Sequence, residues 1–312
     1  MGFILFVLIA LALLVVVSGV YCFIVACVRR KETDWLDEAA LQKTSYAKYH
    51  KAIVASHWWL NEHEVHDVYT RSHDGLQLHG IWIPAENPKG TMLLAHGYRS
   101  TKLLDFGIAF AFYHALGMNL LVPDQRSHGQ SEGTFITFGV KESEDMLTWI
   151  RYHNQHLGGG QLILSGLSMG ASTVMYLADR QLPENVKGII ADCGFSSPKE
   201  IISTVFRRVT HLPAAPSVWI TDLCAKMFAG FGLDEKSSLR SLTNNTVPVL
   251  LIHGTQDNFV PCEMTKKAYE ICTGKKELLL VDGAGHGVSF LTAQERYTQT
   301  VCDFLKDNLE GF

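Results

Sequence analysis

Residues 162–170 read Leu-Ile-Leu-Ser-Gly-Leu-Ser-Met-Gly, an apolar run that breaks into the pentapeptide Gly-Leu-Ser-Met-Gly. Such a run, with little polar alternation, is typical of a central strand buried on both faces, and residues 169–182 carry a helix-like pattern. A tight turn between the two would strain the backbone of Ser168, and it requires Gly166 and Gly170 because a Cβ there would collide with the neighbouring strand and helix. This context favours a G-x-S-x-G nucleophile elbow.

The rest of the chain from residue 64 onward alternates strand-like and helix-like segments. We expect strands at residues 65–70, 76–83, 91–95, 120–123, 162–165, 186–191, 248–252 and 277–281. We expect helices at residues 101–116, 141–155, 169–182, 262–272 and 293–308. This alternation predicts an α/β fold with a mostly parallel eight-stranded sheet, helices on both faces and an antiparallel hairpin at its start.

Residues 196–245 depart from that alternation, because they lie between two expected strands and contain no strand-like segment. Their apolar residues recur at helical spacing within 217–231, at Ile220, Leu223, Cys224, Met227 and Phe231. An insertion at this point lies above the carboxyl ends of the strands, where α/β folds bind ligands. We expect a helical cap over a ligand site; a helical layer that packs only for stability is the alternative.

The amino-terminal region carries a long apolar run, since residues 3–28 contain no charged side chain. At about 1.5 Å per residue, the run can cross a hydrocarbon core of about 30 Å with some tilt. No basic residue precedes it, and it is longer than the apolar core of a signal peptide, so residues 1–28 are expected to be an uncleaved transmembrane anchor. Arg29, Arg30 and Lys31 follow directly, which predicts a single-pass protein of the cell membrane with a cytoplasmic catalytic domain.

Residues 29–60 mix charged and aromatic side chains, which is typical of a short amphipathic helical segment at the membrane face. Three histidines lie close together near its end, at His57, His63 and His66. No cysteine or carboxylate completes a ligand set at metal spacing there, so we expect no metal site.

The seven cysteines form no C-x-x-C pair and suit reduced thiols, which agrees with a cytoplasmic domain. Cys22 and Cys27 could be acylated, but we interpret them as apolar filler of the anchor. The net charge of −4 provides no basic excess for a nucleic-acid partner. No G-x-G-x-x-G spacing is present, so we expect no nucleotide or flavin cofactor. We assign residues 61–312 to one catalytic domain.

A base and an acid for Ser168 are expected after later strands. Asp257 closes the stretch His-Gly-Thr-Gln-Asp that follows one expected strand, and His286 closes Asp-Gly-Ala-Gly-His after the next. The order Ser168, Asp257, His286 is typical of catalytic triads built on a nucleophile elbow. Asp192 also follows a strand and stays the alternative acid, whereas Asp282 is too close to His286 along the chain to orient it.

Taken together, the motifs resemble those of α/β-hydrolase-fold serine hydrolases, similar to the monoglyceride-lipase, feruloyl-esterase and serine-aminopeptidase-like branch, over residues 64–309. His96-Gly97-Tyr98 resembles the family's oxyanion segment, and residues 124–131, Asp-Gln-Arg-Ser-His-Gly-Gln-Ser, resemble its D-x-R-x-H-G-x-S loop. Five motifs therefore arrive in the family's order. Five residues of the two segments 96–98 and 124–131 are expected to have structural roles: His96, Asp124, Arg126, His128 and Ser131.

The resemblance implies a mechanism. His286 would take the proton of Ser168 as the hydroxyl attacks an acyl carbonyl, and Asp257 would orient the imidazole and stabilise its charged form. Backbone N–H groups of Tyr98 and Met169 would form the oxyanion hole.

The expected function is hydrolysis of carboxylic esters by a carboxylesterase or lipase-like serine hydrolase, acting on a small apolar acyl substrate such as a monoacyl lipid. A serine peptidase or aminopeptidase and a thioesterase are the alternative enzymes. A membrane-tethered binding module is the alternative without turnover, and the presence of all three triad residues disfavours it. The sequence leaves the acyl group, the leaving group and the oligomeric state open.

Overall fold

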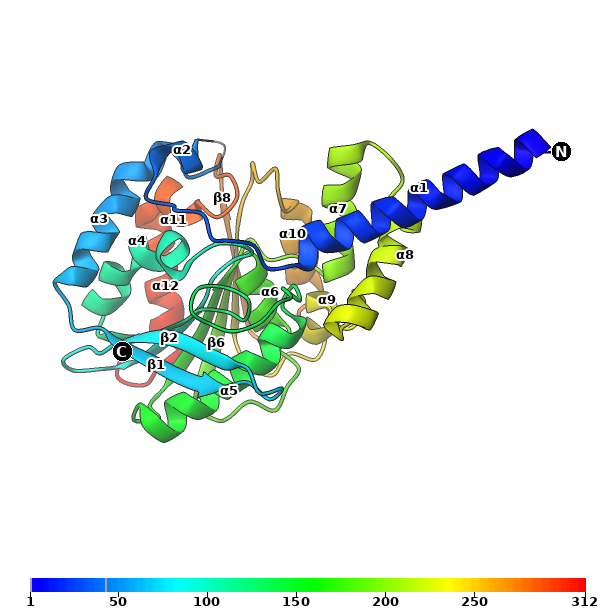
Figure 1. The fold of residues 1–312 in the computed structure, drawn as a ribbon. Coiled ribbons are helices and arrows are strands. Elements are labelled where there is room, and N and C mark those ends of the chain that lie inside the picture. Colours follow the sequence, from blue (N-terminus) through cyan, green and yellow to red (C-terminus); the bar gives the residue numbers. More distant parts are fainter. Residues whose placement is uncertain (1, 43) are drawn as a thin grey trace.

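A computed structural model of the chain describes residues 2–42 and 44–312 (Figure 1). Its centre is a sheet of eight strands within the described residues: β1 (His66–Arg71), β2 (Gln77–Ile83), β3 (Gly90–Ala95), β4 (Met118–Pro123), β5 (Leu162–Leu167), β6 (Val186–Asp192), β7 (Val249–Gly254) and β8 (Lys276–Val281). The spatial order is β1-β2-β4-β3-β5-β6-β7-β8. β2 pairs antiparallel with β1 and β4, and the other neighbouring strands pair parallel. The predicted mostly parallel sheet with an initial hairpin is confirmed.

Helices cover both faces of the sheet (Figure 1). One apolar layer includes side chains of α4 (Lys102–Ala115), α11 (Ser289–Thr292) and α12 (Gln294–Asn308). The other includes side chains of α5 (Val140–His156), α6 (Met169–Met175), α9 (Ser238–Leu242) and α10 (Cys262–Ile271). Successive strand residues point to opposite faces, so Met92 and Leu94 join the first layer while Leu93 and Ala95 join the second. The long apolar runs in the sequence reflect this double burial.

All eight expected strands lie within two residues of the observed bounds at each end. One helix is shorter than expected: the pattern at 169–182 predicted a helix to residue 182, but α6 ends at Met175. The N–H groups of Leu177 and Ala178 donate to carbonyls three residues earlier, and the carbonyl of Ala178 accepts from Thr246 N at 3.0 Å. The chain therefore continues in tighter turns, because these contacts replace the i to i−4 pattern of the helix.

Residues 196–245 form the expected helical segment above the carboxyl ends of the strands. It contains α7 (Pro198–Thr210), α8 (Ala215–Cys224), the π-helical turn η2 (Ala225–Ala229) and α9. The helical spacing noted at 217–231 corresponds to α8 and η2. Side chains of α7, α8 and η2 pack with Phe138 and Met169 in a separate apolar cluster. That cluster also contains Phe23 and Cys27 from the first helix of the chain, α1 (Gly2–Cys27).

Among the described residues, α1 alone is long and apolar enough to cross a membrane, by length and composition. Its first part projects away from the domain, and its last part lies along α8 (Figure 1). Ser18 Oγ and Ser217 Oγ are 2.7 Å apart, and Thr221 Oγ1 donates to the Gly19 carbonyl at 3.0 Å. A Cβ on Gly19 would overlap the side chain of Ile220. The close approach of the two helices therefore depends on the missing side chain at Gly19.

Between α1 and β1 the chain forms α2 (Glu38–Leu41), a short 3₁₀ turn η1 (Ala47–Tyr49) and α3 (His50–Asn61). The expected helical segment is thus present, and α3 packs on α4. Ile53 is fully buried with Leu104 of α4, and Ser56 lies against Gly107 of the same helix. Because α3 rests on α4, the segment extends the hydrophobic core of the domain.

The tight packing between α6 and the sheet can be tested at Gly170. A Cβ there would overlap the carbonyl group of Ala95 and approach the carbonyl of His96 to 2.8 Å. Because these are backbone atoms, Gly170→Ala is expected to lower the free energy of unfolding by about 3 kcal/mol, the upper end of the usual cost of overpacking. Urea unfolding of the full chain in detergent measures this change.

Gly160→Ala is the matched control, because a Cβ at Gly160 has no neighbour within 4 Å among the described residues. Its effect is expected to stay within about 0.5 kcal/mol. Equal losses of unfolding free energy in the two variants would show that contact with the sheet is not the reason for a glycine at position 170.

Candidate active site

Ser168 occupies the turn between β5 and α6 with φ 56° and ψ −114°, a strained conformation for a residue with a side chain. Its N–H donates to the Asp192 carbonyl at 2.8 Å. A Cβ on Gly166 would overlap the backbone of Gly170, which explains the glycines on either side. The predicted elbow geometry is confirmed.

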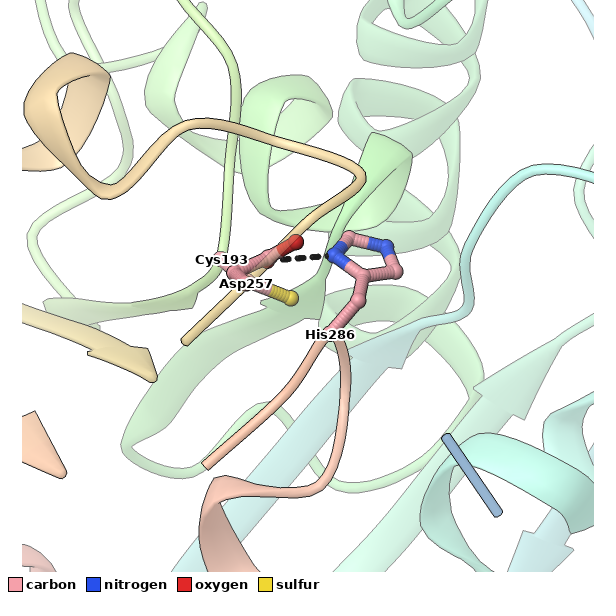
Figure 2. Close-up of side chains that lie close together, drawn as sticks. All are labelled: Cys193, Asp257 and His286. Carbon is pink, nitrogen blue, oxygen red and sulfur yellow. Dashed lines mark hydrogen bonds and ion pairs between the residues drawn. The ribbon is translucent and has the colours of Figure 1, made fainter. Parts of the chain in front are cut away.

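Three residues from different loops form a continuous chain of hydrogen bonds at the carboxyl edge of the sheet. The Nε2 atom of His286 lies 2.9 Å from Ser168 Oγ, and its Nδ1 atom lies 2.6 Å from Asp257 Oδ2. Figure 2 shows the Asp257 carboxylate directed at the imidazole of His286. The structure therefore brings together the three residues that the sequence predicted as a triad.

The Asp257 carboxylate is fixed by further donors. Its Oδ1 accepts from the N–H groups of Phe259 and Val260 at 2.7 and 2.9 Å, and its Oδ2 lies 3.1 Å from His253 Nε2. Burial alone would raise the pKa of Asp257, but hydrogen bonds from His253 and His286 outweigh it and hold the pKa well below its usual value. Asp257 is therefore ionised at neutral pH and can accept a hydrogen bond from the N–H at His286 Nδ1.

His253 is a positioning residue that the sequence reasoning did not identify. It is fully buried at the end of β7, and its Nδ1 lies 2.6 Å from Thr265 Oγ1. If the threonine hydroxyl donates to Nδ1, then Nε2 carries the proton and donates to Asp257. The position of His253 at a strand end, four residues before the acid, is the sequence signal that could have found it.

Asp192 and Asp282 were the other acids considered. Asp192 is buried and accepts from Ser289 Oγ at 3.1 Å, and burial raises its pKa to about 6. Asp282 accepts from Thr255 Oγ1 at 3.0 Å. The carboxylate hydrogen-bonded to His286 is Asp257.

The predicted oxyanion donors belong to two segments next to Ser168. Met169 directly follows the serine and begins α6, so its N–H is one of the helix donors without an intrahelical acceptor. Tyr98 follows Gly97, where an added Cβ would lie 3.3 Å from Ser168 Cβ. Both N–H groups are thus placed near the serine, and their role in binding an oxyanion stays a prediction.

The Asp105 side chain stabilises the oxyanion loop, residues 96–100, by hydrogen bonds. This buried carboxylate of α4 accepts from Gly97 N and from Ser100 Oγ, each at 2.6 Å. Sequence reasoning missed it, because Asp105 stands inside a helical pattern with no motif around it.

His96 and His128 accept hydrogen bonds from backbone N–H groups near this loop. His96 Nε2 accepts from Gln125 N, and His128 Nε2 accepts from Arg99 N, each at 3.0 Å. Burial is the main cause that lowers the pKa of both histidines to about 4, so both rings are neutral at pH 7. Their contacts are those of the structural residues that the sequence suggested.

The 124–131 loop is anchored by ion pairs. Asp124 pairs with His79 Nδ1 and Lys102 Nζ, each at 2.6 Å. Arg126 pairs with two carboxylates, and Ser131 Oγ donates to the Asp124 carbonyl at 2.6 Å. None of these interactions involves Ser168 or His286.

Two groups of side chains in the described part of the chain have potential metal-binding atoms that all lie within 4.8 Å of one another. The first, Cys193, Asp257 and His286, is drawn in Figure 2. Burial raises the pKa of the Cys193 thiol well above its usual value, and Asp257 and His286 are already hydrogen-bonded to each other. The second group contains His73, Asp74 and Asp145. Both of its carboxylates already pair with the guanidinium of Arg126, so neither group fits a metal ion.

A cavity of about 450 Å³ opens at Ser168 and His286. Its wall includes residues of the oxyanion loop, and also Leu167 and Phe259. The segment that follows α1 contributes Thr33, Trp35, Thr44, Ser45 and Tyr46. The sequence analysis placed that segment at the membrane face and did not predict that it lines the cavity.

Two family models match consecutive parts of this chain. A family model described as alpha/beta hydrolase fold matches residues 90–214, and one described as TAP-like protein matches residues 213–309. Among curated relatives, the uncharacterized protein YqkD of Bacillus subtilis is 29% identical over 238 residues, covering 75% of this chain and 77% of its own. The uncharacterized membrane protein YNL320W of Saccharomyces cerevisiae is 25% identical over 237 residues, covering 74% and 76%.

Solved structures share the fold. The Pyrococcus furiosus esterase Pf2001 superimposes with a TM-score of 0.65 at 24% identity, covering 80% of this chain and 94% of that one. An acylaminoacyl peptidase superimposes with a TM-score of 0.61 at 17% identity, covering 80% of this chain and 43% of that one.

The neutral state of His128 predicts a pH dependence of stability. Its pKa is lowered in the folded chain from 6.5 to about 4, so the unfolded chain binds more protons between these values. The stabilisation is complete above about pH 6.5 and is lost as the pH falls through 4, at about 1.4 kcal/mol per pKa unit. The difference in melting temperature between the wild type and His128→Gln should therefore shrink from pH 7 to pH 4.

Gln155→Ala serves as the control, because it changes an exposed side chain that has no titratable group. Its melting-temperature difference from the wild type should stay constant over the same range. A constant difference for His128→Gln as well would contradict the assignment of a neutral acceptor.

Proposed function

Given that this chain belongs to the α/β-hydrolase fold family, we propose that it is a serine hydrolase that cleaves carboxylic esters through an acyl-enzyme on Ser168. The observation that carries the proposal is the hydrogen-bonded series Ser168 Oγ, His286 and Asp257, with spacings of 2.9 and 2.6 Å. A serine hydroxyl is a weak nucleophile at its free pKa, and a base at this distance can activate it.

In acylation, His286 Nε2 takes the Ser168 proton while Oγ forms a bond to the carbonyl carbon. The carbonyl oxygen becomes an oxyanion, which the N–H groups of Tyr98 and Met169 stabilise; loss of one such donor typically costs about 3 kcal/mol. Asp257 stabilises the imidazolium. When the tetrahedral intermediate collapses, the bond to the alkoxy group breaks and His286 donates its proton to the leaving alcohol.

Deacylation repeats these steps with water. His286 takes a proton from water as the hydroxyl oxygen attacks the acyl carbon, and the bond to Ser168 Oγ breaks with return of that proton to the serine. The products are the free acid and the unchanged enzyme.

The cavity wall favours an apolar acyl group, since it includes Trp35, Leu167 and Phe259. A carboxylate free to meet a substrate ammonium group would favour an aminopeptidase. The carboxylate on this wall, Asp105, is already taken up by Gly97 N and Ser100 Oγ. The ester is therefore our proposed substrate class, ahead of a peptide.

We propose further that α1 anchors the enzyme in the cell membrane. The face of the cap next to α1 supports this, because it exposes large apolar side chains at Trp219, Leu223, Met227 and Phe228. One relative is itself named a membrane protein. The basic residues 29–31 directly after α1 favour a cytoplasmic catalytic domain.

The chemistry is tested with a fluorophosphonate probe on the purified full chain. Ser168→Ala and His286→Ala should each abolish covalent labelling and ester turnover, while the melting temperature stays within a few degrees of the wild type, since neither change creates a large cavity. Mass spectrometry should locate the label on the peptide that contains Ser168.

Ser203→Ala on α7 is the matched control, because Ser203 does not line the cavity, and it should be labelled like the wild type. Labelling of the Ser168→Ala variant, or no labelling of folded wild type, would refute an activated serine at position 168.

The orientation is tested with a reporter fused after Phe312. A cytoplasmic orientation predicts that a fused phosphatase that is active only outside the cytoplasm stays inactive, while a fused fluorescent protein that matures only in the cytoplasm is bright. Replacing residues 29–31 by glutamine should weaken this preference. The opposite reporter pattern in the wild type would refute the cytoplasmic domain.

A further inference from the structure

The last turn of α1 is hydrogen-bonded to side chains of the oxyanion loop. The Tyr98 hydroxyl donates to the Ala26 carbonyl at 2.8 Å. The Arg99 guanidinium donates to the carbonyls of Val25 at 2.6 Å and Val28 at 3.1 Å. The last carbonyls of a helix have no intrahelical partner, and a cation near them also meets the negative end of the helix dipole. Two neighbouring side chains of the loop therefore cap α1.

The backbone of the same two residues shapes the site. The N–H of Tyr98 is a proposed oxyanion donor, and the N–H of Arg99 donates to His128 Nε2 at 3.0 Å. Arg99 has φ 53°, so its backbone is held in the left-handed region. The Tyr98 ring stacks on Phe138, with centroids 5.1 Å apart. A shift of either side chain would therefore move the backbone that carries the proposed oxyanion donor, the Tyr98 N–H, and the neighbouring Arg99 N–H that is bonded to His128.

The end of α1 is itself held firmly by the domain. The N–H of Ile136 donates to the Cys27 carbonyl at 2.7 Å, and Arg29 N donates to the Thr134 carbonyl at 2.8 Å. The Arg29 guanidinium donates to the carbonyls of Ser131 at 2.8 Å and Gly129 at 2.7 Å. These bonds make the end of α1 a fixed support rather than the start of a loose linker.

The segment after α1 reaches the site a second time, through Tyr46. The Tyr46 hydroxyl lies 3.1 Å from the carbonyl of Gly287, next to the proposed base, and 3.3 Å from Asp105 Oδ1. Asp105 in turn holds Gly97 N. Tyr46 therefore contacts the His286 loop directly and the oxyanion loop through Asp105.

We infer that the end of α1 is a working part of the active site: it supports the oxyanion loop through the Tyr98 hydroxyl and the Arg99 guanidinium, which act as positioning groups. The inference rests on the proposed function, because the loop affects turnover only if Ser168 attacks a carbonyl. It gives the apolar helix a role in catalysis in addition to anchoring.

Tyr98→Phe isolates this contact. Phenylalanine keeps the ring against Phe138 and keeps the backbone N–H, and it removes only the hydroxyl that donates to α1. With 4-nitrophenyl butyrate and the full chain in detergent micelles, kcat should fall about ten-fold, because loss of an entire oxyanion donor costs about 100- to 1,000-fold and misplacement costs part of that. KM should change by less than about three-fold, since the contact acts on the transition state. Arg99→Met should likewise lower kcat with little change in KM.

Tyr49→Phe is the matched control. The Tyr49 hydroxyl also ties the amino-terminal segment to the domain, at 3.1 Å from Thr292 Oγ1, but this contact is outside the oxyanion loop. Its removal should leave kcat unchanged. An alkyl boronic acid places a boronate oxygen in an oxyanion hole, so its affinity should fall with kcat/KM in Tyr98→Phe and stay constant in Tyr49→Phe.

Hydrogen exchange of the peptide that covers residues 96–101 gives a readout that does not depend on turnover. Faster exchange in Tyr98→Phe than in Tyr49→Phe supports the inference, even if the wild type fails to react with a fluorophosphonate and the proposed function falls. If the wild type reacts and Tyr98→Phe keeps kcat within two-fold with unchanged exchange, the inference is overturned and the proposed function stands.

Discussion

The close packing of α6 against the sheet is the constraint on which the site depends. Gly170 lies directly against the Ala95 carbonyl, and Gly166 lies against the first turn of the helix. This approach forces the chain at Ser168 into a positive φ, which presents the hydroxyl at the carboxyl edge of the sheet. The base and the acid reach the same place because their loops follow neighbouring parallel strands, β7 and β8.

Sequence patterns predict these features because each of them is local. A buried strand is visible as an apolar run and the elbow as two glycines around a serine, and Asp257 and His286 are candidates because each stands just after a strand. The eight strands and the hydrogen-bonded series of three side chains could therefore be predicted from residue order alone. The end of the helix after Ser168 could not, since it depends on a contact with Thr246.

The features that the sequence hides are contacts between distant segments. Asp105 and His253 are buried polar residues whose partners are set by the fold. Asp105 stands inside a helical pattern with no motif around it, and only its place at a strand end, four residues before Asp257, marks His253. Tyr46 belongs to a segment whose aromatic composition is typical of a membrane interface, yet its hydroxyl lies beside Gly287. Composition indicates that such a residue will be at least partly buried, but it does not indicate which part of the chain packs against it.

The contacts of the amino-terminal segment also set an order of assembly during synthesis. The hydrogen-bond partner of Arg29 lies 102 positions later in the chain, that of Ser18 lies 199 positions later, and that of Tyr46 lies 241 positions later. Contacts between residues this far apart close large loops, which costs chain entropy. They therefore form after the local structure that they pack against. The contact of Tyr46 can therefore form only after most of the chain has been synthesised. Until residue 287 has emerged, the cavity lacks part of its wall, so the nascent enzyme carries an incomplete site.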